Sequence, residues 1–114
     1  MGVPSAEVAG TARSHQVLVA RLESLTDEQA RRQSLLPDWT VGHVLTHLAR
    51  NADSVVRRLE GAARGEVVDQ YPGGYAGRAA DIAAGAGRSA TDLVADVAES
   101  AARLDATMAA MPVG

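Results

Sequence analysis

The 114-residue sequence contains no cysteine and no phenylalanine, and all of its basic residues are arginine. Without cysteine, disulfides and thiolate ligands are excluded, so any metal ion would have to be bound by His, Asp or Glu. The chain has no run of about 18 apolar residues, the length needed to span a membrane, and it does not begin with the basic and apolar segments of a signal peptide. We therefore expect a cytoplasmic protein without a membrane partner.

Charge and size narrow the class of protein further. The formal net charge is −3, and a negative chain lacks the usual electrostatic footprint of a nucleic-acid-binding protein. The length is that of one ordinary domain, so we expect a single domain over residues 1–114. Apolar residues make up 46% of the chain, but 23 residues are alanine. Helices in this chain should therefore pack closely through small side chains.

Apolar residues recur at helical spacing along most of the chain, which predicts an all-α fold. We expect three main helices in an up-down-up bundle, and a short connecting helix with a capping box at residues 26–34. The third main helix should be interrupted by two glycines, and its acidic residues should mostly face solvent. The main helices are expected at residues 5–25, 40–64, and 75–84 with 89–111; the acidic residues are Asp92, Asp96, Glu99 and Asp105.

His43 and His47 lie four residues apart, just after the expected helix start at Trp39 and Thr40. Residues at this spacing are neighbours on one helix face, so both imidazoles could reach one divalent ion at about 2.0–2.1 Å. His43 is the weaker candidate because it lies in the first helical turn, close to the positive end of the helix dipole. Two histidines are not a complete zinc site, and a solvated or hydrogen-bonded pair is the alternative.

Other polar residues have two interpretations each. His15 falls inside an apolar stripe, which favours a hydrogen-bonded core residue over a metal ligand. Residues 66–77 are expected to form the one sizeable loop, and they contain Tyr71 and Tyr75, with Arg78 just beyond. These side chains either line a ligand pocket in which Arg78 holds an anionic group, or they cap the core and face solvent.

Three stretches carry a family resemblance: LPDWTVGHVLTHLARNAD at residues 36–53, YPGG at 71–74 and GRAADIAAGAGRSATDLVADV at 77–97. They resemble the N-terminal domain of mycothiol-dependent maleylpyruvate isomerases, a DinB-like four-helix bundle. The resemblance implies a divalent metal, usually zinc, bound by one histidine of the second helix and by a Glu and a His of a fourth helix. His47 matches the second-helix ligand. The implied cofactors are zinc and mycothiol, whose metal-activated thiol would drive cis-trans isomerisation of a small-molecule substrate.

The sequence departs from this pattern because the fourth helix and the C-terminal domain of the family enzymes are missing. One histidine is too few to hold a catalytic zinc, so we expect an incomplete site, with His47 as its metal ligand and no catalytic residue of its own. The chain would be part of such an isomerase or thiol transferase, would be completed by a second copy, or would be a stand-alone module. The alternative function is a non-enzymatic helical module that self-associates or binds a partner helix.

Overall fold

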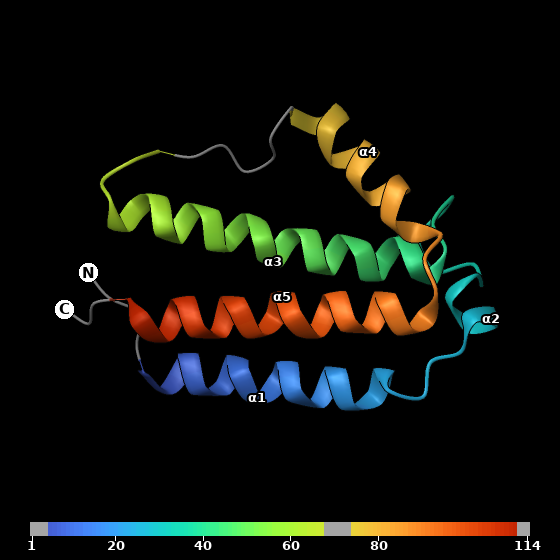
Figure 1. Cartoon of the computed structure of the whole chain (residues 1–114), viewed down its shortest axis with the longest axis horizontal. Coiled ribbons are helices and arrows are strands. Elements are labelled where there is room, and N and C mark those ends of the chain that lie inside the picture. The colour runs from blue at the N-terminus through green and yellow to red at the C-terminus, as the bar shows by residue number, and fades with distance from the viewer. Residues whose placement is uncertain (1–4, 68–73, 112–114) are drawn as a thin grey trace.

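In the computed structural model, residues 5–67 and 74–111 are described, apart from the side chains of residues 5–8 and 75. These residues fold mainly into helices, so the predicted all-α fold is confirmed (Figure 1). The helices are α1 (Ser5–Leu22), α2 (Asp27–Ala30), α3 (Val41–Ala63), α4 (Gly74–Ala86) and α5 (Ala90–Ala110). None of the described helices is both long and apolar enough to cross a bilayer.

Three long helices, α1, α3 and α5, lie side by side, with α5 between the other two (Figure 1). The chain direction reverses from α1 to α3, as expected, but α3 and α5 run in the same direction. The expected up-down-up order is therefore wrong at its last step. The reason is α4, which carries the chain diagonally back to the end of the bundle where α3 begins.

The predicted interruption of the third helix separates two distinct helices, α4 and α5. The short helix α2 is hydrogen-bonded to the turn between α4 and α5. At one end of α2, the Asp27 carboxylate accepts a hydrogen bond of 2.6 Å from the backbone N–H of Ala90, the first residue of α5. At the other end, the guanidinium of Arg31 donates to the backbone carbonyls of Gly87 and Arg88 at 2.6 Å. The first bond satisfies one of the backbone N–H groups that the start of a helix leaves without a partner, and the bonds of Arg31 hold the turn between α4 and α5 against α2.

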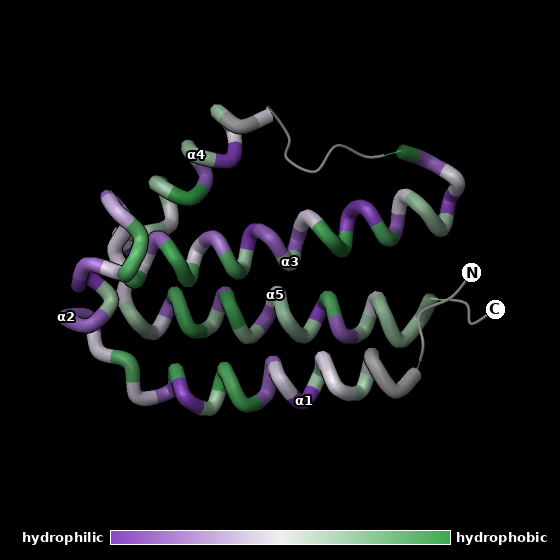
Figure 2. The backbone as a smooth tube through the Cα atoms, turned by 180° about the vertical axis from the view of Figure 1, so that it is seen from behind, coloured by the Kyte–Doolittle hydropathy of each residue, from purple (hydrophilic) through white to green (hydrophobic). Residues whose placement is uncertain are grey.

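The hydrophobic core lies mainly between α3 and α5 and is built from small and medium-sized side chains. Figure 2 shows that apolar residues recur along α1, α3 and α5, as the sequence predicts. The central cluster consists of Ala30, Leu45, Ala49, Leu93 and Val97, with Leu18, Leu22, Leu25 and Val41 packed against it. Close approach is most pronounced at Gly42, where an added Cβ would lie 2.2 Å from the carbonyl oxygen of Ala86. The end of α4 therefore rests directly on the backbone of α3.

A chain of ion pairs also joins α3 to α5. Asp96 of α5 accepts from Arg88 at 2.8 Å and from Arg50 at 2.5 Å. Arg50 in turn lies 3.2 Å from Asp53, which accepts from Arg103 at 2.9 Å. The Asp96 side chain is only 13% exposed. The expectation that it faces solvent is wrong, because two arginines from outside its own helical turn provide the counter-charge that the helix pattern alone does not show.

Candidate functional site

The loop before α3 holds Trp39 in a fixed position. The backbone N–H of Ser34 donates to the carbonyl of Trp39 at 2.9 Å, and the Gln33 amide donates to the carbonyls of Leu36 at 2.8 Å and Trp39 at 3.0 Å. Asp38 adopts the left-handed conformation at φ 66°, which non-glycine residues rarely adopt. The tight turn that results places the indole of Trp39 directly ahead of α3.

The start of α3 is capped by a pair of reciprocal hydrogen bonds. Thr40 is the N-cap, as the sequence predicts, and its hydroxyl accepts from the backbone N–H of His43 at 3.3 Å. In return, Nδ1 of His43 accepts from the backbone N–H of Thr40 at 3.1 Å. This arrangement is a capping box in which an imidazole takes the place of the usual Glu or Gln. Nδ1 of His43 is thus committed to the helix cap, in agreement with its lower rank as a ligand.

His47 lies one turn further along α3 and is half-buried. Its ring centroid is 5.6 Å from that of Trp39, and the ring of His43 stacks on the same indole at 6.2 Å. Arg78 of α4 donates from Nη2 to Nδ1 of His47 at 3.3 Å, and its Cζ lies 5.7 Å from the Trp39 ring centroid. We refer to Trp39, His43, His47 and Arg78 as the Trp-His cluster.

Sequence reasoning found three of these four residues but not their connection. His43 and His47 were selected by their spacing and Arg78 as a possible anion-binding residue, whereas Trp39 was used only to mark the helix start. The signal that could have identified Trp39 was its place directly before the N-cap Thr40, because an apolar side chain at this position often packs back against the start of the helix. The contact of Arg78 depends on the path of α4, which no local pattern predicts.

The environment keeps His47 uncharged. Burial lowers the pKa of the His47 imidazole, and the nearby positive charge of Arg78 lowers this pKa further. The ring is therefore neutral at pH 7 and retains the lone pair that a metal ligand or hydrogen-bond acceptor requires.

Titration of His47 should show this environment directly. By NMR, its ring signals should titrate with a pKa below the ordinary value of 6.5. The unfolded chain then takes up this proton at a higher pH than the folded chain, so stability should fall as the pH drops through about 6.5 toward the folded pKa. In Arg78→Gln the pKa of His47 should rise. An unchanged His47 pKa in that variant would show that the contact with Arg78 does not form in solution.

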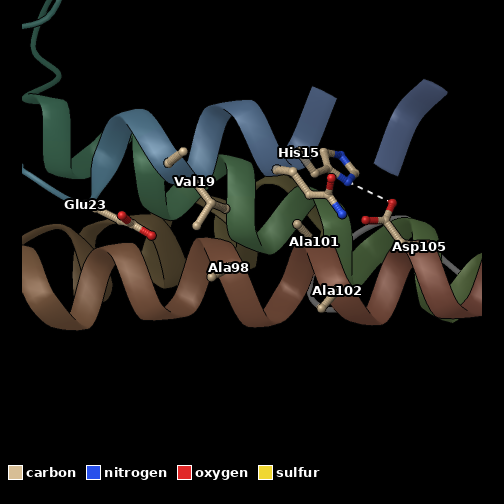
Figure 3. Close-up of a pocket in the computed structure, with 9 residues that line it drawn as sticks. His15, Val19, Glu23, Ala98, Ala101, Ala102 and Asp105 are labelled. Carbon is tan, nitrogen blue, oxygen red and sulfur yellow. Dashed lines mark hydrogen bonds and ion pairs between the residues drawn. The ribbon is translucent and has the colours of Figure 1, made fainter. Parts of the chain in front are cut away.

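His15 belongs to a different part of the fold. Its Nδ1 lies 2.8 Å from the carboxylate of Asp105, which links α1 to α5 across a groove with a volume of about 320 Å³ (Figure 3). The prediction of a hydrogen-bonded histidine is therefore confirmed. The expectation that Asp105 faces solvent is wrong, because it pairs with His15 and is 22% exposed. The pair lies toward the C-terminal end of α5, away from the start of α3, so His15 and His47 do not converge.

The described side chains do not form a complete metal site. Within residues 5–67 and 74–111, no three His, Asp or Glu side chains gather in a way that could hold a metal ion. His47 therefore stays a predicted ligand. Of the two loop tyrosines, Tyr71 lies outside the described residues and the side chain of Tyr75 is among those not described.

Comparison with known proteins places the fold and this site in context. Residues 11–114 match the family described as the mycothiol maleylpyruvate isomerase N-terminal domain. The crystal structure of the mycothiol-dependent maleylpyruvate isomerase is similar to the chain with a TM-score of 0.84 and 27% identity. The crystal structure of a histidine-to-alanine mutant of that isomerase is similar to the chain with a TM-score of 0.83 and 26% identity. Each match covers 96% of the chain, which spans 46% of the solved protein's length. No curated protein matches the chain.

Proposed function

The chain belongs to the mycothiol maleylpyruvate isomerase N-terminal domain family, and from this we propose that it is the metal-binding part of a mycothiol-dependent isomerase or thiol transferase. The DinB-like fold of the solved isomerase supports the assignment. In this proposal His47 is one ligand of a divalent metal ion, with zinc as the expected metal. The observation that carries the proposal is the neutral, half-buried imidazole of His47, held at the start of α3 by Trp39 and Arg78.

The Trp-His cluster offers the right kind of ligand for a metal ion, an imidazole, but it offers too few ligands to hold the ion. The neutral imidazole of His47 is a suitable zinc ligand, and a zinc site needs three or more such groups. The remaining ligands would have to come from outside the described residues, either from a further segment of the protein or from a second copy of the chain. We therefore expect the chain alone to bind zinc weakly.

The residues of the cluster have separate tasks in this proposal. The ring of Trp39 packs against the ring of His47, and burial, together with the positive charge of Arg78, lowers the pKa of the His47 imidazole and so keeps it uncharged. When bound, the metal would lower the pKa of the mycothiol thiol and so favour its nucleophilic thiolate form. Maleylpyruvate is the substrate that the family name suggests, and another small molecule that accepts a thiol is compatible with the same site.

A zinc titration followed by NMR tests the role of His47. We expect zinc to shift the ring signals of His47 before those of His15, and His47→Ala to weaken zinc binding by at least about tenfold. His15→Ala is the matched control, because it removes an imidazole that is bonded to Asp105 instead. Zinc that shifts the His15 signals first, or leaves those of His47 in place, would refute the proposal.

Light scattering on a sizing column, with and without zinc, distinguishes the ways of completing the site. A dimer that forms only with zinc, and not in His47→Ala, would mean that a second copy supplies ligands. A metal-independent dimer with unchanged zinc content in His47→Ala would instead favour a non-enzymatic helical interaction module. A zinc-binding monomer would indicate that the missing ligands lie in a further segment of the protein.

A further inference from the structure

The loop between α2 and α3 holds leucine side chains in solvent. Leu35 is fully exposed and Leu36 is half exposed. The Ser34 hydroxyl donates to the backbone carbonyl of Trp39 at 2.7 Å and accepts from the backbone N–H of Leu36 at 3.1 Å. The side-chain amide of Gln33 also donates to carbonyls of this loop. These bonds fix the loop backbone from within, so the exposure of its leucines is built into its conformation.

A hollow with a volume of about 470 Å³ lies beside these leucines. Leu48, one turn beyond Val44 on α3, is also exposed. A contiguous group of exposed apolar side chains, unlike a single one, marks an interaction surface. The hollow is lined by Gln33, Ser34, Leu35, Leu36, Val41 and Val44. We refer to the apolar residues here as the leucine surface, which consists of Leu35, Leu36, Val41, Val44 and Leu48.

The leucine surface carries a projection and a hollow side by side. Leu35 is the projection, whereas the side chains of Val41 and Val44 lie in the hollow. In a two-fold dimer the same surface faces itself, so a residue of one copy that contacts a second residue of the other is contacted in the same way in return. Leu35 of each copy could therefore fill the hollow of the other. A surface that supplies both halves of such a contact favours a second copy of this chain as its partner.

Charged residues at the two ends of the loop fit the same arrangement. Arg32 lies at the start of the loop and Asp38 near its end, and both are exposed. The carboxylate of Glu28 lies 3.8 Å from Arg32 and is itself exposed, so this pair holds the arginine only weakly. A two-fold axis through the loop would lay two loops antiparallel, with Arg32 of each copy toward Asp38 of the other. The charges of the two copies would then be complementary.

We propose that the leucine surface is the interface of a homodimer in which each copy inserts Leu35 into the hollow of the other. Burial of the exposed apolar side chains would drive the association. A standard interface involves roughly 20–30 residues on each side, many more than this surface offers. The dimer is therefore expected to be weak and to dissociate on dilution. This proposal does not rest on the proposed function, because none of these residues is a metal ligand.

Sedimentation velocity at a series of micromolar concentrations, with a chelator present, measures the dimer directly. The unmodified chain should show a concentration-dependent dimer. Leu35→Ser should weaken dimerisation at least about tenfold, because each dimer loses two buried leucine side chains. Asp38→Asn should weaken it about threefold and make it less sensitive to salt. Asparagine tolerates the left-handed backbone at residue 38, so this variant removes only the charge.

Val67→Ser is the matched control, because Val67 is as exposed as Leu35 but follows the opposite end of α3 (Figure 1). Its dimer affinity should equal that of the unmodified chain, and thermal melting shows whether each variant keeps its fold. A chain that stays monomeric would overturn the proposal and would mean that a different partner covers the leucine surface. Equal dimerisation of Leu35→Ser and Val67→Ser, or a dimer that requires zinc and disappears in His47→Ala, would overturn it as well.

Discussion

Gly42→Ala should lower the free energy of unfolding by about 3 kcal/mol, at the upper end of the usual range for overpacking. The added Cβ would lie 2.2 Å from the carbonyl oxygen of Ala86 and 3.3 Å from that of Ala30. Both neighbours are backbone atoms, so no side chain can rotate out of the way. The end of α4 would have to move off α3, and Arg78 would move with it. Chemical denaturation followed by circular dichroism measures the effect.

Gly10→Ala in α1 is the control for this substitution. Among the described side chains, an added Cβ at residue 10 meets only the end of Arg13, at 3.8 Å. Because alanine favours a helix interior over glycine, this variant should gain roughly 0.5–1 kcal/mol of stability. If both variants changed stability in the same direction, the close approach of α3 and α4 at Gly42 would not be the cause.

Asp96→Ala should have the second largest effect, a loss of about 2–3 kcal/mol, because it leaves two partly buried arginines without their shared carboxylate. Arg50 would keep only the carboxylate of Asp53. Its Nε is buried and makes no hydrogen bond with the rest of the described chain, so its positive charge depends on the two carboxylates at Nη2. Urea unfolding at low and high salt gives the magnitude.

Glu99→Ala on the same helix is the control, because Glu99 is exposed and its replacement should change stability by no more than about 0.5 kcal/mol. The loss in Asp96→Ala should persist at high salt, since partly buried pairs are screened less than exposed ones. Equal effects of the two substitutions would mean that the ion pairs between α3 and α5 contribute nothing beyond surface charge.

The sequence predicted those elements of the fold that local chemistry determines. Thr40 is predictable as an N-cap because a hydroxyl directly before an apolar helix can accept from the free backbone N–H groups of its first turn. In the structure, the Thr40 hydroxyl accepts from the backbone N–H of His43. The glycines at residues 85–87 marked a break correctly. Helical periodicity predicts which face of each helical piece is apolar, but it does not predict the angle between the two pieces. Periodicity therefore predicts one interrupted helix, whereas α4 and α5 are separate helices and α5 runs in the same direction as α3.

The candidate site was predictable only as far as it lies on one helix. The i, i+4 spacing of His43 and His47 is visible in the sequence, as is the position of Trp39 before them. Arg78 reaches His47 across 31 residues of chain, so its contact depends on the tertiary path and on the space that Gly42 leaves for α4. The burial of Asp96 escaped prediction for the same reason, since its partner Arg50 lies 46 residues away.

The central position of α5 has a consequence for the order in which the domain assembles. It is the last described helix to leave the ribosome, yet α1 and α3 both pack on it and make few contacts with each other. During synthesis α1 and α3 therefore emerge first, and their apolar faces stay exposed until α5 packs between them. The packing of α5 on α1 joins segments that are far apart in the chain, which slows folding compared with a bundle of sequential hairpins. During synthesis, the packing of α1 and α3 therefore depends on α5, which leaves the ribosome after both of them.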